Sequence, residues 1–100
     1  MIIAELAIFP TSEGTSVSRY VKAAVEALEE TGLTTHTGPM ATCIEGPDLS
    51  AILRAVERAH RAMVDMGARR IHIDLRIDHR LDKEATMAAK LASIGKGDHA

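Results

Sequence analysis

A strict alternation of apolar and polar residues marks the segment Ile71–Ile77. This period of two is typical of a β-strand with one buried face. The polar side of the strand carries an imidazole, a carboxylate and a guanidinium, on His72, Asp74 and Arg76. The segment Ile2–Phe9 differs, because apolar residues occupy both of its faces and Glu5 is its only charge. We therefore predict a small sheet with one face that the helices of the chain leave uncovered.

Two segments carry apolar residues at helical spacing. The first begins at Ser16, a predicted N-cap, and ends at Gly32. Its apolar stripe consists of Val17, Val21, Ala24, Val25 and Leu28. The second begins at Asp48, also a predicted N-cap, and ends at Gly67. Its predicted buried stripe consists of Leu49, Ile52, Leu53, Val56, Ala59 or His60, Met63 and Val64.

Between these helices the sequence predicts two short strands, Thr34–Gly38 and Met40–Glu45, joined by a turn at Gly38–Pro39. A third helix is predicted from about Asp82 to Ile94. The element order is then βαββαβ with an extra C-terminal helix, which is the ferredoxin-like α+β plan with a four-stranded antiparallel sheet. We expect one domain over residues 1–95 and a flexible tail over residues 96–100.

Right-handed crossovers place both main helices on one face of this sheet. If Ala4, Leu6 and Ile8 face the helices, the opposite face carries Ile3, Glu5, Ala7 and Phe9. An uncovered face with apolar side chains predicts a homo-oligomer.

The composition narrows the function classes. The chain has 100 residues, a net charge of −2 and two aromatic residues, so it offers no basic stripe or stacking platform for nucleic acid. Its single cysteine, Cys43, excludes an internal disulfide and fits a reducing compartment. No apolar run is long enough for a membrane span. We expect a cytoplasmic protein with no nucleic-acid or membrane partner.

Little in the sequence indicates catalysis. His72 and Asp74 share one strand face and, with Glu5 on a neighbouring strand, would resemble part of a metal site. An ion-pair row that is solvated or lies at a subunit interface explains the same residues better, because metal sites need three or four converging ligands. Cys43 has no basic neighbour in sequence, which favours an inert thiol over a nucleophile. We expect no metal, no cofactor and no catalytic residue.

A set of hydroxyl, carboxylate and apolar residues remains as a candidate ligand site. Thr42 and Glu45 belong to a strand beside the first one, and Ser16 and Ser18 lie at the mouth of the first helix. Phe9 and Met40 add apolar surface. The alternative explanation is equally simple: threonine favours strands, glutamate favours the surface, and capping accounts for Ser16.

Four groups of residues follow one another along the chain. They are Phe9–Pro10 with Gly14–Ser18 and Tyr20–Val21; Gly38–Thr42 with Ile44–Gly46; Glu57 with Ala59–His60, Gly67 and Arg70; and Arg76–Arg80 with Lys90. In this order and spacing they resemble the small thiamine-binding protein family, over nearly the whole chain from Ile2 to about Ile94.

The resemblance implies a ferredoxin-like fold, tetramers built by sheet-face packing, and non-catalytic binding of thiamine or its hydroxymethylpyrimidine part. The implied ligand residues are Ser16, Ser18, Thr42, Glu45, Met40, Phe9 and Glu5. Hydroxyl groups suit the aminopyrimidine, and Glu5 or Glu45 would suit a thiazolium cation. Two other functions stay open: a small metal-dependent or otherwise catalytic enzyme using Glu5, His72 and Asp74, and a purely structural assembly subunit.

Overall fold

The computed structural model describes residues 1–96. Seven elements follow one another along the chain: β1 (Ile2–Pro10), α1 (Ser18–Glu29), β2 (Thr34–Thr37), β3 (Thr42–Gly46), α2 (Leu49–Asp65), β4 (Ile71–Asp78) and α3 (Met87–Ser93). The strands form one antiparallel sheet in the order β2-β3-β1-β4. This arrangement confirms the predicted ferredoxin-like α+β fold with an extra C-terminal helix.

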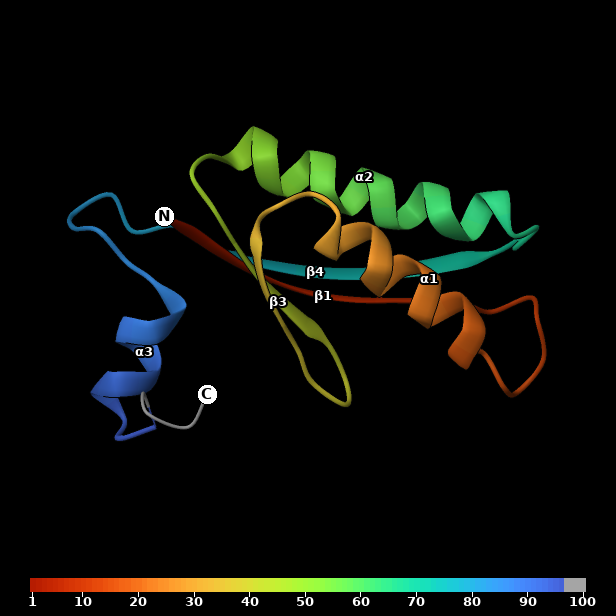
Figure 1. The fold of residues 1–100 in the computed structure, drawn as a ribbon, viewed down its shortest axis with the longest axis horizontal. Helices are drawn as coiled ribbons and strands as arrows, with labels where there is room; N and C mark the ends of the chain where they lie inside the picture. Colours follow the sequence, from red (N-terminus) through yellow and green to blue (C-terminus); the bar gives the residue numbers. More distant parts are fainter. Residues whose placement is uncertain (97–100) are drawn as a thin grey trace.

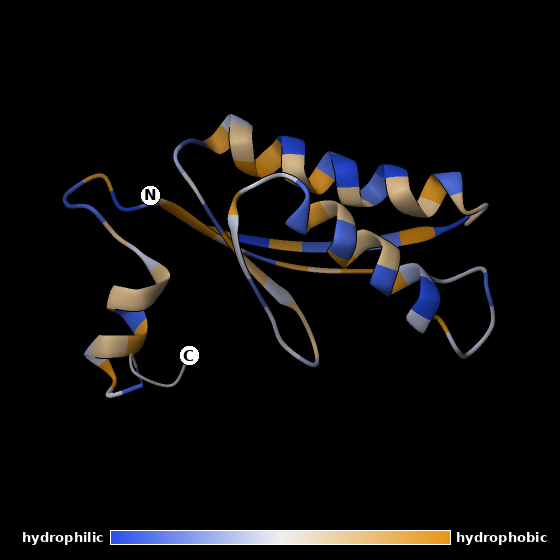
Figure 2. Cartoon of the chain, viewed as in Figure 1, coloured by the Kyte–Doolittle hydropathy of each residue, from blue (hydrophilic) through white to orange (hydrophobic). Residues whose placement is uncertain are grey.

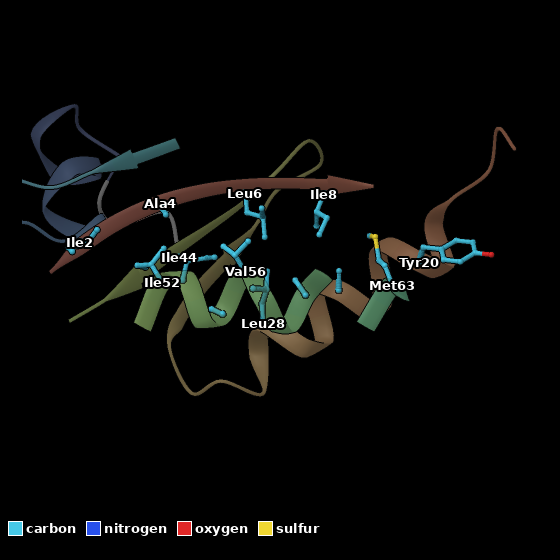
Figure 3. Packing of buried hydrophobic residues seen from close by; sticks show 13 residues of the cluster. Ile2, Ala4, Leu6, Ile8, Tyr20, Leu28, Ile44, Ile52, Val56 and Met63 are labelled. Carbon is cyan, nitrogen blue, oxygen red and sulfur yellow. The ribbon is translucent and has the colours of Figure 1, made fainter. Parts of the chain in front are cut away.

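The sheet has one covered and one open face. Helices α1 and α2 lie side by side on the same face (Figure 1). The side chains of Ile2, Ala4, Leu6 and Ile8 point from β1 into the layer between sheet and helices (Figure 3). The alternate residues of β1 are less buried and lie on the opposite, open face: Ile3, Glu5, Ala7 and Phe9. The predicted faces of β1 are therefore confirmed.

The core is built from apolar side chains of the sheet and of helices α1 and α2. Leu6, Leu28, Ile44, Ile52 and Met63 are the largest side chains that are fully buried. Burial of each such side chain contributes about 1.5–3 kcal/mol relative to exposure. The predicted N-cap of α2 is confirmed, since Asp48 Oδ1 accepts a hydrogen bond of 2.8 Å from the backbone N–H of Ala51.

The predicted N-cap of α1 is wrong. Val17, not Ser16, precedes the helix, and no side chain caps it. Side-chain hydrogen bonds hold the preceding loop instead. The Tyr20 hydroxyl donates to Glu13 at 2.8 Å, and Ser12 Oγ accepts from the backbone N–H groups of Arg69 and Arg70 at 3.0 and 3.1 Å. These bonds tie the loop before α1 to the helix on one side and to the segment before β4 on the other.

Two other boundaries differ from the prediction. Strand β3 begins at Thr42, so Met40 lies in the turn, where a hydrogen bond of 2.9 Å from the Gly38 N–H to the Ala41 carbonyl closes the hairpin. Helix α3 begins at Met87, after Thr86, whose hydroxyl accepts from the Ala89 N–H at 3.0 Å. A true N-cap at Thr86 sets this start and leaves Asp82 in the loop.

The predicted buried stripe of α2 is partly wrong. Leu49, Leu53 and Val64 are 45–47% exposed, whereas Ile52, Ala59 and Met63 are buried. The exposed residues share the flank of α2 turned away from α1. Their exposure has a simple cause: β4 is the last strand on that side, and no other element of residues 1–96 covers this flank.

Helix α3 lies apart from the α1–α2 layer, near the start of β1 (Figure 1). None of its side chains is buried. Glu45 of β3 accepts a hydrogen bond of 2.7 Å from the Met87 N–H, and Lys90 pairs with Asp78 of β4 at 2.7 Å. Polar contacts therefore attach α3 to one end of the sheet. Of the predicted tail, Lys96 is exposed and residues 97–100 lie outside the described part of the chain.

Candidate functional site

A narrow slot opens where the β2–β3 hairpin leaves β1. Strand β3 pairs with β1 only as far as Thr42 opposite Leu6, although β1 continues to Pro10. The turn of the hairpin projects beyond this point (Figure 1). Between the turn, the end of β1 and helix α1 lies a cavity of about 150 Å³. The segment Ala7–Phe9 has no β3 partner, so backbone groups of β1 are left open toward the slot.

The lining of the slot is mostly apolar and carries no charged side chain. It consists of Leu6, Ala7, Ile8, Phe9, Val21, Val25, Leu28, Thr37, Gly38, Pro39, Met40, Ala41 and Thr42. Apolar walls with a few polar groups are typical of small-molecule sites, though those for drug-sized ligands measure about 300 Å³ or more. The volume and lining suit a single neutral ring better than a charged or larger molecule.

The side-chain hydroxyl groups in this slot belong to Thr37 and Thr42. Thr42 is only 4% exposed, and its hydroxyl lies 3.4 Å from that of Thr37. Hydroxyl–hydroxyl bonds are ordinarily about 2.7–2.8 Å long, so this contact leaves much of the hydrogen-bonding capacity of both groups unused. A ligand that enters the slot therefore meets two threonine hydroxyl groups able to donate or accept.

Phe9, Met40 and Thr42 of the predicted ligand residues line this slot, although the ring of Phe9 lies on the open sheet face, stacked on His72. The structure separates the two carboxylates from them. Glu5 and Glu45 lie on the open sheet face, whereas Thr42 faces the helices. Glu45 is already engaged as the acceptor for the Met87 N–H. The seven residues predicted to bind ligand thus do not form one pocket.

Ser16 and Ser18 do not line the slot. Both are exposed, and Ser18 is the first residue of α1. Nearby, the hydrogen bonds that Glu13 accepts from Ser12 and Tyr20 hold the pKa of that carboxyl below its usual range. The same bond from Tyr20 to Glu13 raises the pKa of the phenol. These shifts have a structural explanation, because the network fixes the loop before α1.

The open sheet face carries the residues considered for metal-dependent catalysis. Arg76 lies 3.8 Å from Glu5, and the rings of His72 and Phe9 stack with centroids 5.0 Å apart. Asp74 is opposite Ala7. No group of three His, Cys, Asp or Glu side chains among residues 1–96 is arranged to hold a metal ion. The face is a row of cross-strand pairs.

A second cavity of about 340 Å³ lies on this open face, beside α3. Glu5, Arg76, Asp78 and Lys90 line it together with Cys43, and the four charged residues form two ion pairs. Burial and the nearby Glu5 carboxylate raise the pKa of the Cys43 thiol. A raised pKa keeps the thiol protonated and therefore unreactive.

Sequence reasoning missed the contribution of α1 to the slot. Val21 and Val25 belong to the predicted apolar stripe of this helix, and both are only partly buried and line the slot. No local signal distinguishes a helix residue beside a cavity from one in the core. Pro39, in the hairpin turn, is the lining residue that the sequence indicates, since the Gly38–Pro39 turn is predicted.

None of the helices within residues 1–96 combines the length and the apolar character needed to cross a bilayer.

Among solved structures, the chain is similar to the hypothetical protein MJ1052 from Methanocaldococcus jannaschii, with a TM-score of 0.87 and 41% identity over 95% of this chain and 96% of that one. It also shares its fold with a Thermotoga maritima protein, TM0486, described as a putative thiamine biosynthesis/salvage protein. That likeness has a TM-score of 0.80 and 22% identity, covering 93% and 97% of the two chains.

By sequence, the chain is 41% identical to the UPF0045 protein MJ1052 over 95 residues, which cover 95% of this chain and 93% of the relative. It is 36% identical to the UPF0045 protein YqgV of Bacillus subtilis, over 96% of each chain. The family model described as thiamine-binding protein matches residues 4–95. The chain belongs to the thiamine-binding protein family.

Proposed function

We propose that this protein binds thiamine or its hydroxymethylpyrimidine part without catalysing a reaction, and that the pyrimidine ring occupies the slot between α1 and the hairpin turn. Family membership supports the ligand class. The description of the Thermotoga maritima protein, which shares the fold, points to the same chemistry. The observation that carries the location is the buried Thr42 hydroxyl with its weak contact to Thr37.

The chemistry of the ring matches the slot. An aminopyrimidine has an amino donor and ring-nitrogen acceptors, and threonine hydroxyl groups serve either partner. The open backbone edge at Ala7–Phe9 adds donors and acceptors of the kind that a neighbouring strand would use. Val21, Val25 and Met40 supply apolar contact with the ring faces. The absence of charge in the lining favours the neutral pyrimidine over the thiazolium, which would project toward solvent.

We also propose an oligomeric state, a location in the cell and a domain organisation for this protein. The open sheet face carries half-buried Ile3 and Ala7 together with Phe9, which supports packing of sheet faces in a homotetramer. A free cysteine and the lack of a bilayer-spanning helix in the described residues fit a cytoplasmic location. We propose a single ligand-binding domain over residues 1–95.

Titration calorimetry with hydroxymethylpyrimidine, thiamine and thiamine phosphates tests the function. We expect hydroxymethylpyrimidine to bind about as tightly as thiamine, because the slot recognises the ring. Substitution Thr42→Val keeps the shape and removes the hydroxyl, which costs about 1–3 kcal/mol, or roughly a 5- to 150-fold loss of affinity. The control is Thr35→Val, on the same sheet face but outside the slot, which leaves affinity unchanged.

Two further variants locate the ligand. Glu45→Gln and Ser18→Ala leave affinity unchanged if the ring lies in the slot, because neither residue lines it. A loss of affinity in Glu45→Gln, with Thr42→Val unaffected, would place the ligand on the open face instead. Failure of the wild type to bind any of these compounds would refute the proposed function.

A further inference from the structure

Three arginine side chains form a row on the solvent side of α2. They are Arg54, Arg58 and Arg61, and all three are exposed. Their spacing of four and three residues places them on one side of the helix, over about 10 Å of its length at about 1.5 Å per residue. Figure 2 shows hydrophilic residues along the side of α2 that is turned away from the sheet. We call these three residues the arginine row.

The arginine row has no ion-pair partner among residues 1–96, although α2 itself carries Glu57 and Asp65. Four other cations of the chain are paired: Lys22 with Glu26, Arg76 with Glu5, Arg80 with Asp82, and Lys90 with Asp78. A guanidinium presents its N–H donors in a planar fork that matches the geometry of a carboxylate. The row is therefore able to bind anionic groups from outside the chain.

A hollow of about 130 Å³ lies beside the row, where the segment after α1 meets α2. Arg54 and Arg58 line it, and no carboxylate does. The other lining residues are Thr31, Leu33, Ala51 and Ala55. The Thr31 hydroxyl is already engaged, because it donates to the Leu28 carbonyl at 2.6 Å and accepts from the Leu33 N–H at 3.2 Å. The hollow thus offers apolar surface next to two guanidinium groups.

We propose that the arginine row binds an acidic helical segment of a partner protein, which places one aliphatic side chain in the hollow beside Arg54 and Arg58. A partner helix with carboxylates four and three residues apart repeats the spacing of the row. An apolar cavity of roughly 150 Å³ can hold a benzene molecule, so this hollow has room for one aliphatic side chain. A second hollow, of about 220 Å³, continues along the row and is lined by Glu57, Arg58 and Arg61. Arg58 lines both hollows and is therefore the central contact.

The lining favours a protein segment over a phosphate or a nucleic acid. Phosphate sites present backbone N–H groups or free hydroxyl groups to the ion, whereas this hollow has apolar side chains and an engaged hydroxyl. A nucleic acid needs a longer basic surface and aromatic residues for stacking, and the chain has a net charge of −2 and two aromatic residues. The hollow shares no residue with the slot, so binding here is independent of the proposed thiamine site.

Fluorescence anisotropy with a synthetic helical peptide tests the proposal. The probe carries three glutamates at the spacing of the row and a leucine beside the first two, and a matched peptide has glutamine in place of each glutamate. We expect the wild type to bind the acidic probe about tenfold more tightly than the glutamine peptide at low salt. Arg58→Gln should weaken binding of the acidic probe about fivefold, as is typical for loss of an exposed ion pair. Equal affinity of the wild type for both peptides, or equal binding by Arg54→Gln/Arg58→Gln/Arg61→Gln, would overturn the proposal.

Two matched variants and three competitors locate the site. Arg69→Gln removes the same charge from an exposed residue outside both hollows and should leave affinity unchanged, whereas Glu57→Gln removes a carboxylate from the second hollow and should strengthen binding. A probe with serine in place of leucine should bind more weakly if the hollow holds that side chain. Circular dichroism checks that each variant is folded. Equal losses in Arg69→Gln and Arg58→Gln would refute the proposed site. Displacement of the probe by inorganic phosphate, by an RNA oligonucleotide or by phosphatidylserine vesicles as readily as by unlabelled peptide would refute an acidic protein segment as the partner.

Discussion

The carboxylate of Glu45 lies 2.7 Å from the backbone nitrogen of Met87, the first residue of α3. The first amides of a helix have no partner within the helix, and an acceptor from outside satisfies one of them. Thr86 satisfies another through the Ala89 N–H. Glu45 therefore joins α3 to the end of β3, an inner strand of the sheet, and this role explains a glutamate on β3 without a ligand.

Glu45→Ala should loosen α3. Loss of this hydrogen bond from a half-exposed carboxylate weakens the attachment of α3 by about 1 kcal/mol. Limited trypsin digestion followed by mass spectrometry should show faster cleavage after Lys90. Glu45→Gln keeps an acceptor oxygen and should be cleaved more slowly than Glu45→Ala. Equal cleavage of wild type and Glu45→Ala would show that the bond does not hold the helix.

Met63→Ala should destabilise the whole domain. Met63 is fully buried in the core, so its truncation leaves a cavity and costs about 2–5 kcal/mol. Urea unfolding followed by circular dichroism measures the change in free energy of unfolding. Met40→Ala is the matched control, because Met40 is 87% exposed in the hairpin turn and its loss should leave that free energy nearly unchanged. Similar losses in both variants would contradict the assignment of the core.

The contact between Asp78 and Lys90 should depend on pH. The hydrogen bond from Lys90 lowers the pKa of Asp78 in the folded protein. A carboxyl group with a lowered pKa stabilises the folded state above its unfolded pKa of about 3.9, and this contribution is lost as pH falls through the folded pKa. The amide chemical shifts of α3 should therefore titrate with a midpoint below about 3.9.

Asp78→Asn is the control for this titration. The variant lacks the ionisable group, so its α3 shifts should show no transition in that range. A transition of the same size in Asp78→Asn would assign the effect to another group, such as Asp82, whose pKa is lowered by its hydrogen bond from Arg80.

The fold was predictable because its signals are local and periodic. Alternation in Ile71–Ile77 and the position of Asp48 before an apolar stripe identified a strand and a helix start that the structure confirms. The start of α1 was not predictable in this way. It depends on Ser12, which contacts the backbone of Arg69 and Arg70 from a distant part of the chain. No periodicity reports such a contact.

The candidate site was predicted less well. Thr42 and Glu45 are three residues apart on one strand, and an odd spacing places side chains on opposite faces. The sequence therefore predicts that the side chains of Thr42 and Glu45 point to opposite faces of the sheet, once both residues are assigned to β3. The slot itself was not predictable from the sequence, because it exists only where the hairpin diverges from β1 after Leu6. The divergence is a tertiary property, and Val21 of α1 takes part in it without any distinguishing local signal.

The order of strands in the sheet has a consequence for synthesis of the chain. Strand β1 leaves the ribosome before the other three strands, yet it occupies an inner position and pairs with β4, which is made after α2. Until β4 emerges, one edge of an almost wholly apolar strand is open in the nascent chain. Open edges and exposed apolar surface promote aggregation of incomplete chains. Slow translation of the segment before β4 would prolong the interval in which the incomplete chain can aggregate. A chaperone that covers β1 during this interval would reduce that aggregation.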